Sequence, residues 1–543
     1  MSGWVGQLMI LPILLPLLAG AAMVLLGEQR RRVKAALGVA SVLAVLGVAV
    51  LLLWRADAVD GMAGIYRLGD WPAPFGIVLV VDRLSAMMVL LASILALAAL
   101  VFSLANWHRA GPHFHPLFQF LLMGLNGAFL TGDVFNLFVF FEILLAASYG
   151  LALYGAGIAR IRAGLHYIAV NLSASLLFLI GAGLLYGAAG TLNMADLAAR
   201  LPMLTGSDRA LFEAGAAILG TAFLVKAGMW PLGFWLAPTY AVASPPAAAI
   251  FAIMSKVGVY AVLRLWLLLF GAEHGSAMAF GADWLLFGGI VTVGFGAIGV
   301  LATQDMGHLA GSSILVSSGT LLAAIGVGQV GVTAGALFYL VSSTLAICAF
   351  FLLIELVERD REASADVLAV TLEAFGEGEA PPDAADPVGT ATPVAMAMLG
   401  ISFVCCALLL AGLPPLSGFI AKFAVLTALL NPVGAAAGGA VPAGSWALLA
   451  VVIFSGFTAI VAMTRAGIRV LWSPLDRSVP EVRGAEIAPI ALLLLLCLGL
   501  TVQAGPVMRY MQDAAVSLYT PLDYVRSVLP AAVGTARPGG GGA

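Results

Sequence analysis

Long apolar blocks, separated by short polar loops, fill almost the whole chain. A helix needs about 20 residues to cross the roughly 30 Å hydrocarbon core of a bilayer, and apolar blocks of that length recur along the sequence. The pattern predicts an all-α protein with about fourteen transmembrane helices. They are expected near residues 5–27, 34–54, 77–106, 113–131, 134–154, 165–190, 211–232, 246–271, 281–302, 307–327, 332–357, 391–430 (interrupted), 446–472 and 487–511.

The composition strengthens this interpretation. Hydrophobic residues make up 62% of the 543 residues and charged residues 10%, whereas a soluble domain has about 25% charged residues. The first apolar block has its arginines after it, so we expect a transmembrane helix there and not a cleaved signal. Basic residues are concentrated in the odd-numbered loops, as at 30–34. By the positive-inside rule both termini are expected on the non-cytoplasmic side.

Two of the predicted helices are interrupted. The stretch FLVKAGMWPLGFWLAP (223–238) contains Pro231, and AGLPPLSGFIAKFAVL (411–426) contains Pro414 and Pro415. Proline inside a helix removes a backbone donor, which at membrane depth is tolerated only beside protein or a water-filled cavity. Broken helices in corresponding positions of two halves point to an ion path in a transporter built from repeats.

Hydropathy and the break positions predict two five-helix units, each with its fourth helix broken. The predicted regions are 1–112 with three helices, 113–271 as the first unit, 272–480 as the second unit, and 481–543 with one helix and a disordered tail. One acidic segment, 358–389, is long enough to be a flexible cytoplasmic linker or a docking segment for a partner.

Lysine is rare in this chain, and most of the lysines lie within apolar segments. Of the four lysines, Lys34 lies in the basic first loop, while Lys226, Lys256 and Lys422 fall inside predicted spans. A lysine at the centre of a span costs about 2.5–3.5 kcal/mol on an insertion scale, so these residues are expected to face a hydrated interior or to pair with an acid. Glu142, eight residues into its own predicted helix, is the candidate acid.

These groups suit proton transfer. Burial disfavours the charged form of a side chain, and an opposite charge nearby favours it. A lysine that approaches and leaves Glu142 would therefore gain and lose its proton, whereas arginine would keep it. The expected order is Glu142, Lys226, Lys256, a hydrated middle with His308, and Lys422.

A structural interpretation stays open for each of these residues. Glu142 would then serve only as the partner of Lys226, Lys256 would snorkel toward an interface, and Lys422 would satisfy carbonyls freed by its helix break. His308 would be a surface histidine at a helix start. Asp133 is expected to be a helix N-cap.

Three stretches resemble a known family. They are FQFLLMGLNGAFLTGDVFNLFVFFEILLAASYGL (118–151), FLVKAGMWPLGFWLAPTYAVASPPAAAIFAIMSKVGVYAVLR (223–264) and LPPLSGFIAKF (413–423). They resemble the antiporter-like subunits shared by proton-pumping NADH:quinone oxidoreductase and the multisubunit cation/proton antiporters, most closely the D subunit of the Mrp (Mnh or Pha) antiporter.

The resemblance implies fourteen helices with two inverted five-helix repeats, in the inner membrane of a bacterium. It also implies exchange of Na⁺ or K⁺ for protons within a hetero-oligomer. Family roles map to Glu142 and Lys226 as a coupled pair, Lys256 as the next relay, and Lys422 as the terminal relay.

The sequence departs from the family in the middle of this row. Many relatives carry a histidine or lysine in the eleventh helix, where this chain reads YLVSSTLAICAFF, with Ser342 and Ala346. The middle of the relay is therefore expected to use water, His308, or the hydroxyls of Ser342, Ser343 and Thr344.

The leading hypothesis is a subunit of a cation/proton antiporter, a secondary transporter and not an enzyme. The alternative is a proton-pumping membrane subunit of a respiratory NADH:quinone oxidoreductase. A third hypothesis, a self-sufficient transporter with its own sodium site, lacks the cluster of carboxylates that a hard cation prefers. The expected partners are other antiporter subunits, the lipid bilayer, protons and Na⁺ or K⁺. No cofactor, metal or nucleic acid is expected. The nucleotide-like GFGAIG at 294–299 lies inside a predicted span, where small residues pack helices.

Overall fold

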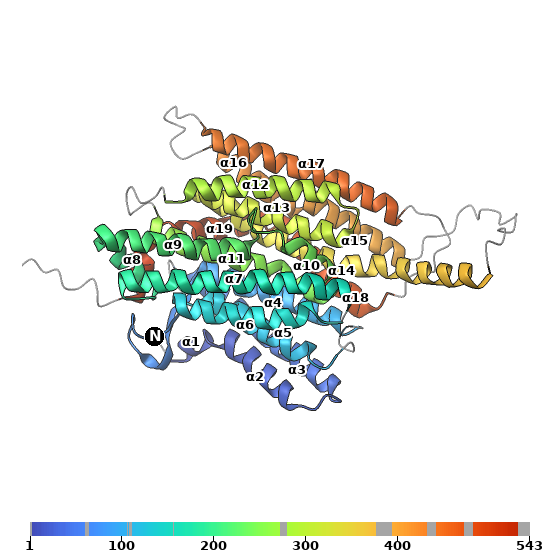
Figure 1. The fold of residues 1–543 in the computed structure, drawn as a ribbon, viewed down its shortest axis with the longest axis horizontal. Helices are drawn as coiled ribbons and strands as arrows, with labels where there is room; N and C mark the ends of the chain where they lie inside the picture. Colours follow the sequence, from blue (N-terminus) through green and yellow to red (C-terminus); the bar gives the residue numbers. More distant parts are fainter. Residues whose placement is uncertain are drawn as a thin grey trace, which may run out of the picture.

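The computed structural model describes residues 3–59, 64–105, 107, 111–155, 157–271, 280–375, 394–431, 441–471 and 482–529. Within them, long helices lie side by side in one bundle (Figure 1). Twelve are long and apolar enough to cross a membrane, and three shorter apolar helices lie beside them: α2 (Leu11–Leu25), α5 (Phe114–Leu130) and α16 (Ser417–Leu430). The predicted all-α membrane fold with about fourteen spans is confirmed.

The bundle begins with three long helices and a small hairpin. These elements are α1 (Gly3–Leu8), α2 (Leu11–Leu25), α3 (Arg31–Ala58), β1 (Gly64–Arg67), β2 (Val78–Val81) and α4 (Arg83–Ser103), with a 3₁₀ turn at Leu68–Asp70. The antiparallel pairing of β1 with β2 was not predicted. Because β2 occupies the start of the region, the helix expected over 77–106 begins later than predicted. That helix starts at Arg83 because the Asp82 carboxylate accepts a hydrogen bond from the Ser85 backbone N–H, at 2.8 Å, in a capping box.

The first five-helix unit follows, with its fourth helix broken. Its elements are α5 (Phe114–Leu130), α6 (Val134–Ala152), α7 (Ile158–Ala189), α8 (Met194–Arg200), a 3₁₀ turn (Leu201–Met203), α9 (Gly206–Ala227), α10 (Leu236–Val242) and α11 (Pro245–Phe270). The short α8 lies outside the spans, so α9 and α10 form the broken fourth helix. Nearly every residue of α11 is buried, so this helix runs through the core.

The second unit has the same order, again with the fourth helix broken. It comprises α12 (Ala282–Ala302), α13 (Met306–Val327), α14 (Val330–Phe375), the broken pair α15 (Val394–Ala411) and α16 (Ser417–Leu430), and α17 (Ala443–Leu471). Helix α14 projects from one end of the bundle, opposite the end that carries α1 and α8 (Figure 1). The flexible linker expected over 358–389 is therefore wrong for residues 358–375; the rest lies outside the described residues.

The last candidate span is α18 (Gly484–Val502), and the chain continues past it with α19 (Ala504–Leu518) and α20 (Pro521–Val528). The expected span over 487–511 ends early, and residues 504–528, assigned to span and tail, form two helices packed on the bundle. Tyr519, which follows α19, shares a hydrogen bond with Thr333 of α14 at 3.1 Å. Buried residues on one face of each helix explain this packing, which a search for long apolar blocks misses.

Candidate functional site

Lys226 lies at the last turn of α9, next to the first helix break. The helix ends because Gly228 adopts a left-handed conformation, with φ 78°, which glycine reaches without strain. The backbone N–H of Met229 then closes onto the Leu224 carbonyl at 3.0 Å. Pro231 follows within the non-helical segment that leads to α10. The break therefore holds Lys226, which is 4% exposed, in the interior of the bundle.

Backbone groups freed by this break are satisfied by neutral donors and acceptors. The indole N–H of Trp235 donates to the Val225 carbonyl at 3.3 Å. The Trp230 backbone N–H donates to the hydroxyl of Thr292 on α12 at 2.9 Å. Neither bond involves the Lys226 ammonium, so that group is not needed to cap the broken backbone.

The surroundings of the Lys226 ammonium are aromatic and acidic. Among the described residues its Nζ has no hydrogen-bond partner, and it lies 5.1 Å from the centroid of the Phe141 ring. Glu142, the next residue on α6, accepts a hydrogen bond from the Ser175 hydroxyl and is within electrostatic reach of Lys226. In the described part of the chain no ion pair or hydrogen bond joins the two side chains.

Lys256 occupies the middle of α11 and is fully buried. Its ammonium donates a hydrogen bond to the Ser318 hydroxyl of α13 at 3.1 Å. Two residues on, Gly258 packs against the end of α9, where an added Cβ would lie 2.6 Å from the Ala227 backbone nitrogen. This close approach, which only glycine allows, places the helix of Lys256 directly against the end of α9 that carries Lys226.

Two hydroxyl pairs continue the row from α13 to α16. Ser317, beside Ser318, has its Oγ 2.9 Å from the Ser343 Oγ on α14. The next α14 residue toward the N-terminus, Ser342, has its Oγ 2.8 Å from the Ser417 Oγ, at the start of α16. Buried hydroxyls thus connect three helices between Lys256 and the second helix break.

A small cavity lies beside these hydroxyls. Its volume is about 20 Å³, and its walls include the hydroxyl-bearing side chains of Ser342, Ser343 and Ser455 together with Leu410. A cavity of this size and polarity suits a single water molecule. It therefore joins the hydroxyl pairs to the backbone of the second break.

Lys422 lies on α16, just after that break. Helix α15 ends as α9 does, because Gly412 is left-handed with φ 75°. The Lys422 ammonium donates to the carbonyls of Leu410 at 3.3 Å and Ala411 at 3.0 Å. Lys422 thus satisfies the carbonyls freed by its break, the structural role that the sequence left open.

Comparisons with known proteins establish the family of this chain. A family model described as NADH:quinone oxidoreductase/Mrp antiporter, TM, matches residues 131–374. A Rhizobium meliloti protein described as a probable K(+)/H(+) antiporter D subunit is 58% identical over 98% of this chain and 99% of its own length. The chain belongs to the family of antiporter D subunits.

Two further similarities extend the comparison. The Na(+)/H(+) antiporter D subunit of Alkalihalophilus pseudofirmus is 32% identical and covers 96% of this chain and 99% of its own length. One chain of the solved Mrp complex from a Dietzia species superposes with a TM-score of 0.81, at 24% identity, over 97% of this chain and 100% of that chain. At 24% identity, the similarity to the chain of the Dietzia complex shows a shared fold.

Not every predicted residue of this antiporter protein lies in the row. His308 sits in the first turn of α13, with 43% of its side chain exposed and its Nδ1 3.1 Å from the Asp305 carboxylate. Ser318 is ten residues further along the same helix, about 15 Å away. The structure therefore places hydroxyls, and not His308, between Lys256 and Lys422. Thr344, also predicted for this stretch, instead donates to the Leu340 carbonyl of its own helix, at 2.6 Å.

Some of the other charged residues of the antiporter protein cap or join helices. Asp133 caps α6 by accepting from the Asn136 N–H at 2.8 Å, as predicted. Asp82 also accepts two hydrogen bonds from the guanidinium of Arg264 on α11, one of them at 2.8 Å. Lys34, expected in a loop, lies in the first turn of α3 and is 2% exposed.

Sequence reasoning missed several residues of this site. Ser175, Trp235, Ser317, Ser318 and Ser417 all bond to the row or to its helix breaks. Their only signal is the adjacent serine pairs at 317–318 and 342–343, since apolar spans seldom carry hydroxyls side by side without a partner.

Proposed function

We propose that this chain is the proton-carrying subunit of a multisubunit complex that exchanges K⁺ or Na⁺ for protons across a bacterial inner membrane. The observation that carries the proposal is the line of buried lysines and hydroxyls between the two broken helices. The names of the relatives, antiporter subunits for K(+)/H(+) and Na(+)/H(+), support the class of transport. The 58% identity to an antiporter subunit favours this function over the respiratory alternative.

In the proposed route the proton enters at Lys226, whose charge Glu142 stabilises. It passes to Lys256, whose helix packs against the end of α9, and from Lys256 to Ser318. A hydroxyl both donates and accepts hydrogen bonds, so the bonded pairs Ser317–Ser343 and Ser342–Ser417 can carry the proton on toward Lys422, with water bridging from one bonded pair to the next.

The proposed sidedness places α1 and α8 away from the cytoplasm. The basic residues counted loop by loop support it, because the odd-numbered loops hold most of them. The extension of α14 lies at the opposite end of the bundle and therefore faces the cytoplasm (Figure 1).

The test uses the complete set of neighbouring subunits, in everted membrane vesicles from a host without other antiporters. A preformed pH gradient is challenged with K⁺ or with Na⁺. Wild type is expected to dissipate the gradient, and Lys226→Ala, present at the same level in the assembled complex, is expected not to. Lys34→Ala, which changes a buried lysine outside the row, is the matched control and should retain exchange.

Two outcomes would overturn the proposal. Equal exchange by wild type and Lys226→Ala would make Lys226 structural. A wild-type complex that ignores both cations and pumps protons on addition of NADH would instead establish the respiratory function.

A further inference from the structure

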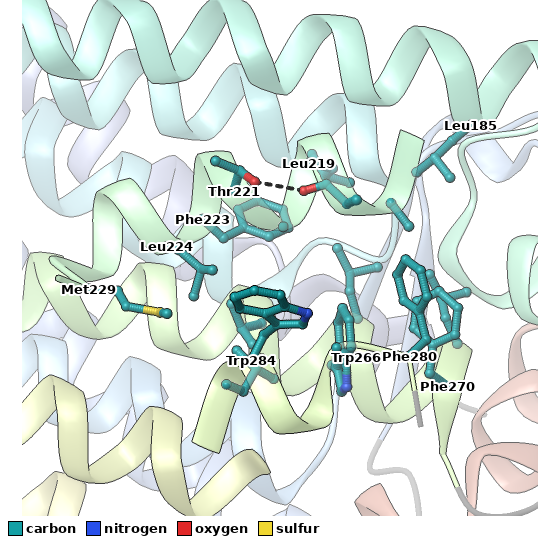
Figure 2. Close-up of a pocket in the computed structure, with 18 residues that line it drawn as sticks. Leu185, Leu219, Thr221, Phe223, Leu224, Met229, Trp266, Phe270, Phe280 and Trp284 are labelled. Atoms are coloured by element: carbon teal, nitrogen blue, oxygen red, sulfur yellow. Dashed lines mark hydrogen bonds between the residues drawn. The ribbon is translucent and has the colours of Figure 1, made fainter. Parts of the chain in front are cut away.

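A large cavity lies away from the lysine row, between α9, α11 and the start of α12. Its volume is about 530 Å³. Figure 2 shows its lining, with Met229 toward one end and Trp266, Phe270 and Phe280 gathered toward the other. No ionisable side chain is among the lining residues. The Thr221 hydroxyl already donates to the Ala217 carbonyl at 2.9 Å.

The lining is therefore mostly apolar and suits hydrocarbon. Its side-chain polar groups are the Thr221 hydroxyl and the indole N–H groups of Trp266 and Trp284, too few to replace the hydration of an ion or a cluster of waters. An apolar ligand would cost no hydrogen bond at Thr221, because the Thr221 hydroxyl is already bonded to the Ala217 carbonyl.

The depth of the cavity matches one leaflet of a bilayer. Along α11 its walls run from Val262 to Phe270, eight residues or about 12 Å, compared with about 15 Å for half of the hydrocarbon core. Its end at Trp266 and Phe270 lies on the side of the bundle where α11 finishes. The tryptophans at that end are typical of the level where hydrocarbon meets headgroups.

The cavity is continuous with the surface that meets the bilayer. Trp284, at its mouth, is 75% exposed, and the exposed apolar side chains of Leu211 on α9 and Phe287 on α12 lie on the same spans. These helices cross the membrane, so hydrocarbon is the medium at this mouth.

We propose that this cavity binds one acyl chain of a membrane lipid, from the leaflet on the α1 and α8 side. The chain would lie along α11 with its end near Met229, in the first helix break. Phe223 forms part of the wall, and its ring stacks on Phe141 with centroids 6.2 Å apart. Phe141 is the ring beneath the Lys226 ammonium, so the bound chain supports the aromatic wall of the proton site from its far side.

The fold supplies a matched pair of variants. A Cβ added at Gly220, in the cavity wall, meets no atom within 4 Å, and the same holds at Gly294, on α12 outside the cavity. Gly220→Leu therefore puts a side chain into the cavity, whereas Gly294→Leu adds the same side chain to α12 at a position outside the cavity. Both changes remove a helix glycine, so any general gain in helix stability is common to them.

The test reconstitutes the assembled complex in vesicles that contain a phosphatidylcholine with a photoreactive diazirine in the middle of one acyl chain. After illumination, the labelled peptides are mapped by mass spectrometry. Wild type and Gly294→Leu should be labelled inside the cavity, at Leu224, Met229 and Val262, and Gly220→Leu should lose this label several-fold while keeping label on the exposed face at Phe287.

Three results would contradict the proposal. Equal labelling of the cavity residues in Gly220→Leu and wild type would show that the label comes from elsewhere. Label confined to Phe287 and other exposed residues in wild type would show that no chain enters. Lipid label on another subunit of the complex, with none on the residues that line this cavity, would contradict a lipid occupant. The readout does not use transport, so it is independent of the proposed function.

Discussion

The first helix break, after α9, and the second, after α15, are built alike but treat their lysines differently. Each helix ends at a left-handed glycine, Gly228 or Gly412. At the first break a tryptophan indole caps the freed carbonyl, and the Lys226 ammonium has no hydrogen-bond partner among the described residues. At the second break the Lys422 ammonium is itself the cap, with two carbonyls as acceptors.

This difference assigns the two lysines different tasks. A hydrogen bond to a charged group contributes about 1.5–3 kcal/mol, so removing the proton from Lys422 disturbs two such bonds. Lys226 has none to lose, and its charge depends on the nearby Glu142 and Phe141. We therefore propose that Lys226 is the member of the row that changes its proton most freely, and that Lys422 is the terminal relay, which also holds a helix break together.

The largest effect is expected from Lys226→Arg. A guanidinium keeps its proton under all physiological conditions, so the variant preserves the positive charge over Phe141 but cannot release a proton. Cation-driven loss of the pH gradient should disappear, although the complex assembles. Near-normal exchange by the arginine variant would show that Lys226 serves as a fixed charge.

The next largest effect separates the two tasks of Lys422. Lys422→Ala leaves the carbonyls of Leu410 and Ala411 unsatisfied, at a cost of about 1–3 kcal/mol per buried group, so both stability and exchange should fall. Lys422→Arg should restore the thermal stability of the purified complex and leave exchange abolished. If the arginine variant recovers exchange together with stability, Lys422 is only a cap.

A smaller effect is expected when the first break is made to resemble the second. Trp235→Phe removes the indole donor to the Val225 carbonyl, at a cost of about 1 kcal/mol. The carbonyl keeps its bond from the Gly228 backbone N–H, at 3.2 Å, and its second lone pair becomes open to another donor such as Lys226. Exchange should fall a few-fold with only a slight loss of thermal stability. Tyr510→Phe, which removes a donor to the Arg83 carbonyl elsewhere in the bundle, is the control and should leave exchange unchanged. An equal effect of the two variants would contradict the capping argument.

Much of the site can be predicted from the sequence, because charged side chains and helix breaks are energetically unfavourable in a membrane. Glu142, Lys226, Lys256 and Lys422 stand out as charges in apolar spans, and the prolines at 231, 414 and 415 mark the breaks. These features depend on local sequence, so they can be recognised without a structure.

The connections within the site depend on residues far apart in the chain. The hydrogen bond between Ser342 and Ser417 joins positions 75 residues apart. The Trp235 indole, which donates to the Val225 carbonyl next to Lys226, comes from beyond the break. His308 was assigned to the row by residue type, whereas its place in the first turn of α13, beside Asp305, keeps it exposed. Helices α19 and α20 escaped prediction because they are apolar on one face only.

The most direct test of the account is whether the hydroxyl of Ser342 is needed for exchange. The rate at which K⁺ or Na⁺ collapses a pH gradient is measured for the assembled complex with Ser342→Ala, Ser342→Thr and the control Thr344→Val. Because a hydroxyl is the required group, Ser342→Ala should slow exchange strongly, while Ser342→Thr, whose extra methyl group can enter the adjacent cavity, and Thr344→Val should stay close to wild type. Equal rates for Ser342→Ala and Ser342→Thr would contradict a proton path through these hydroxyls.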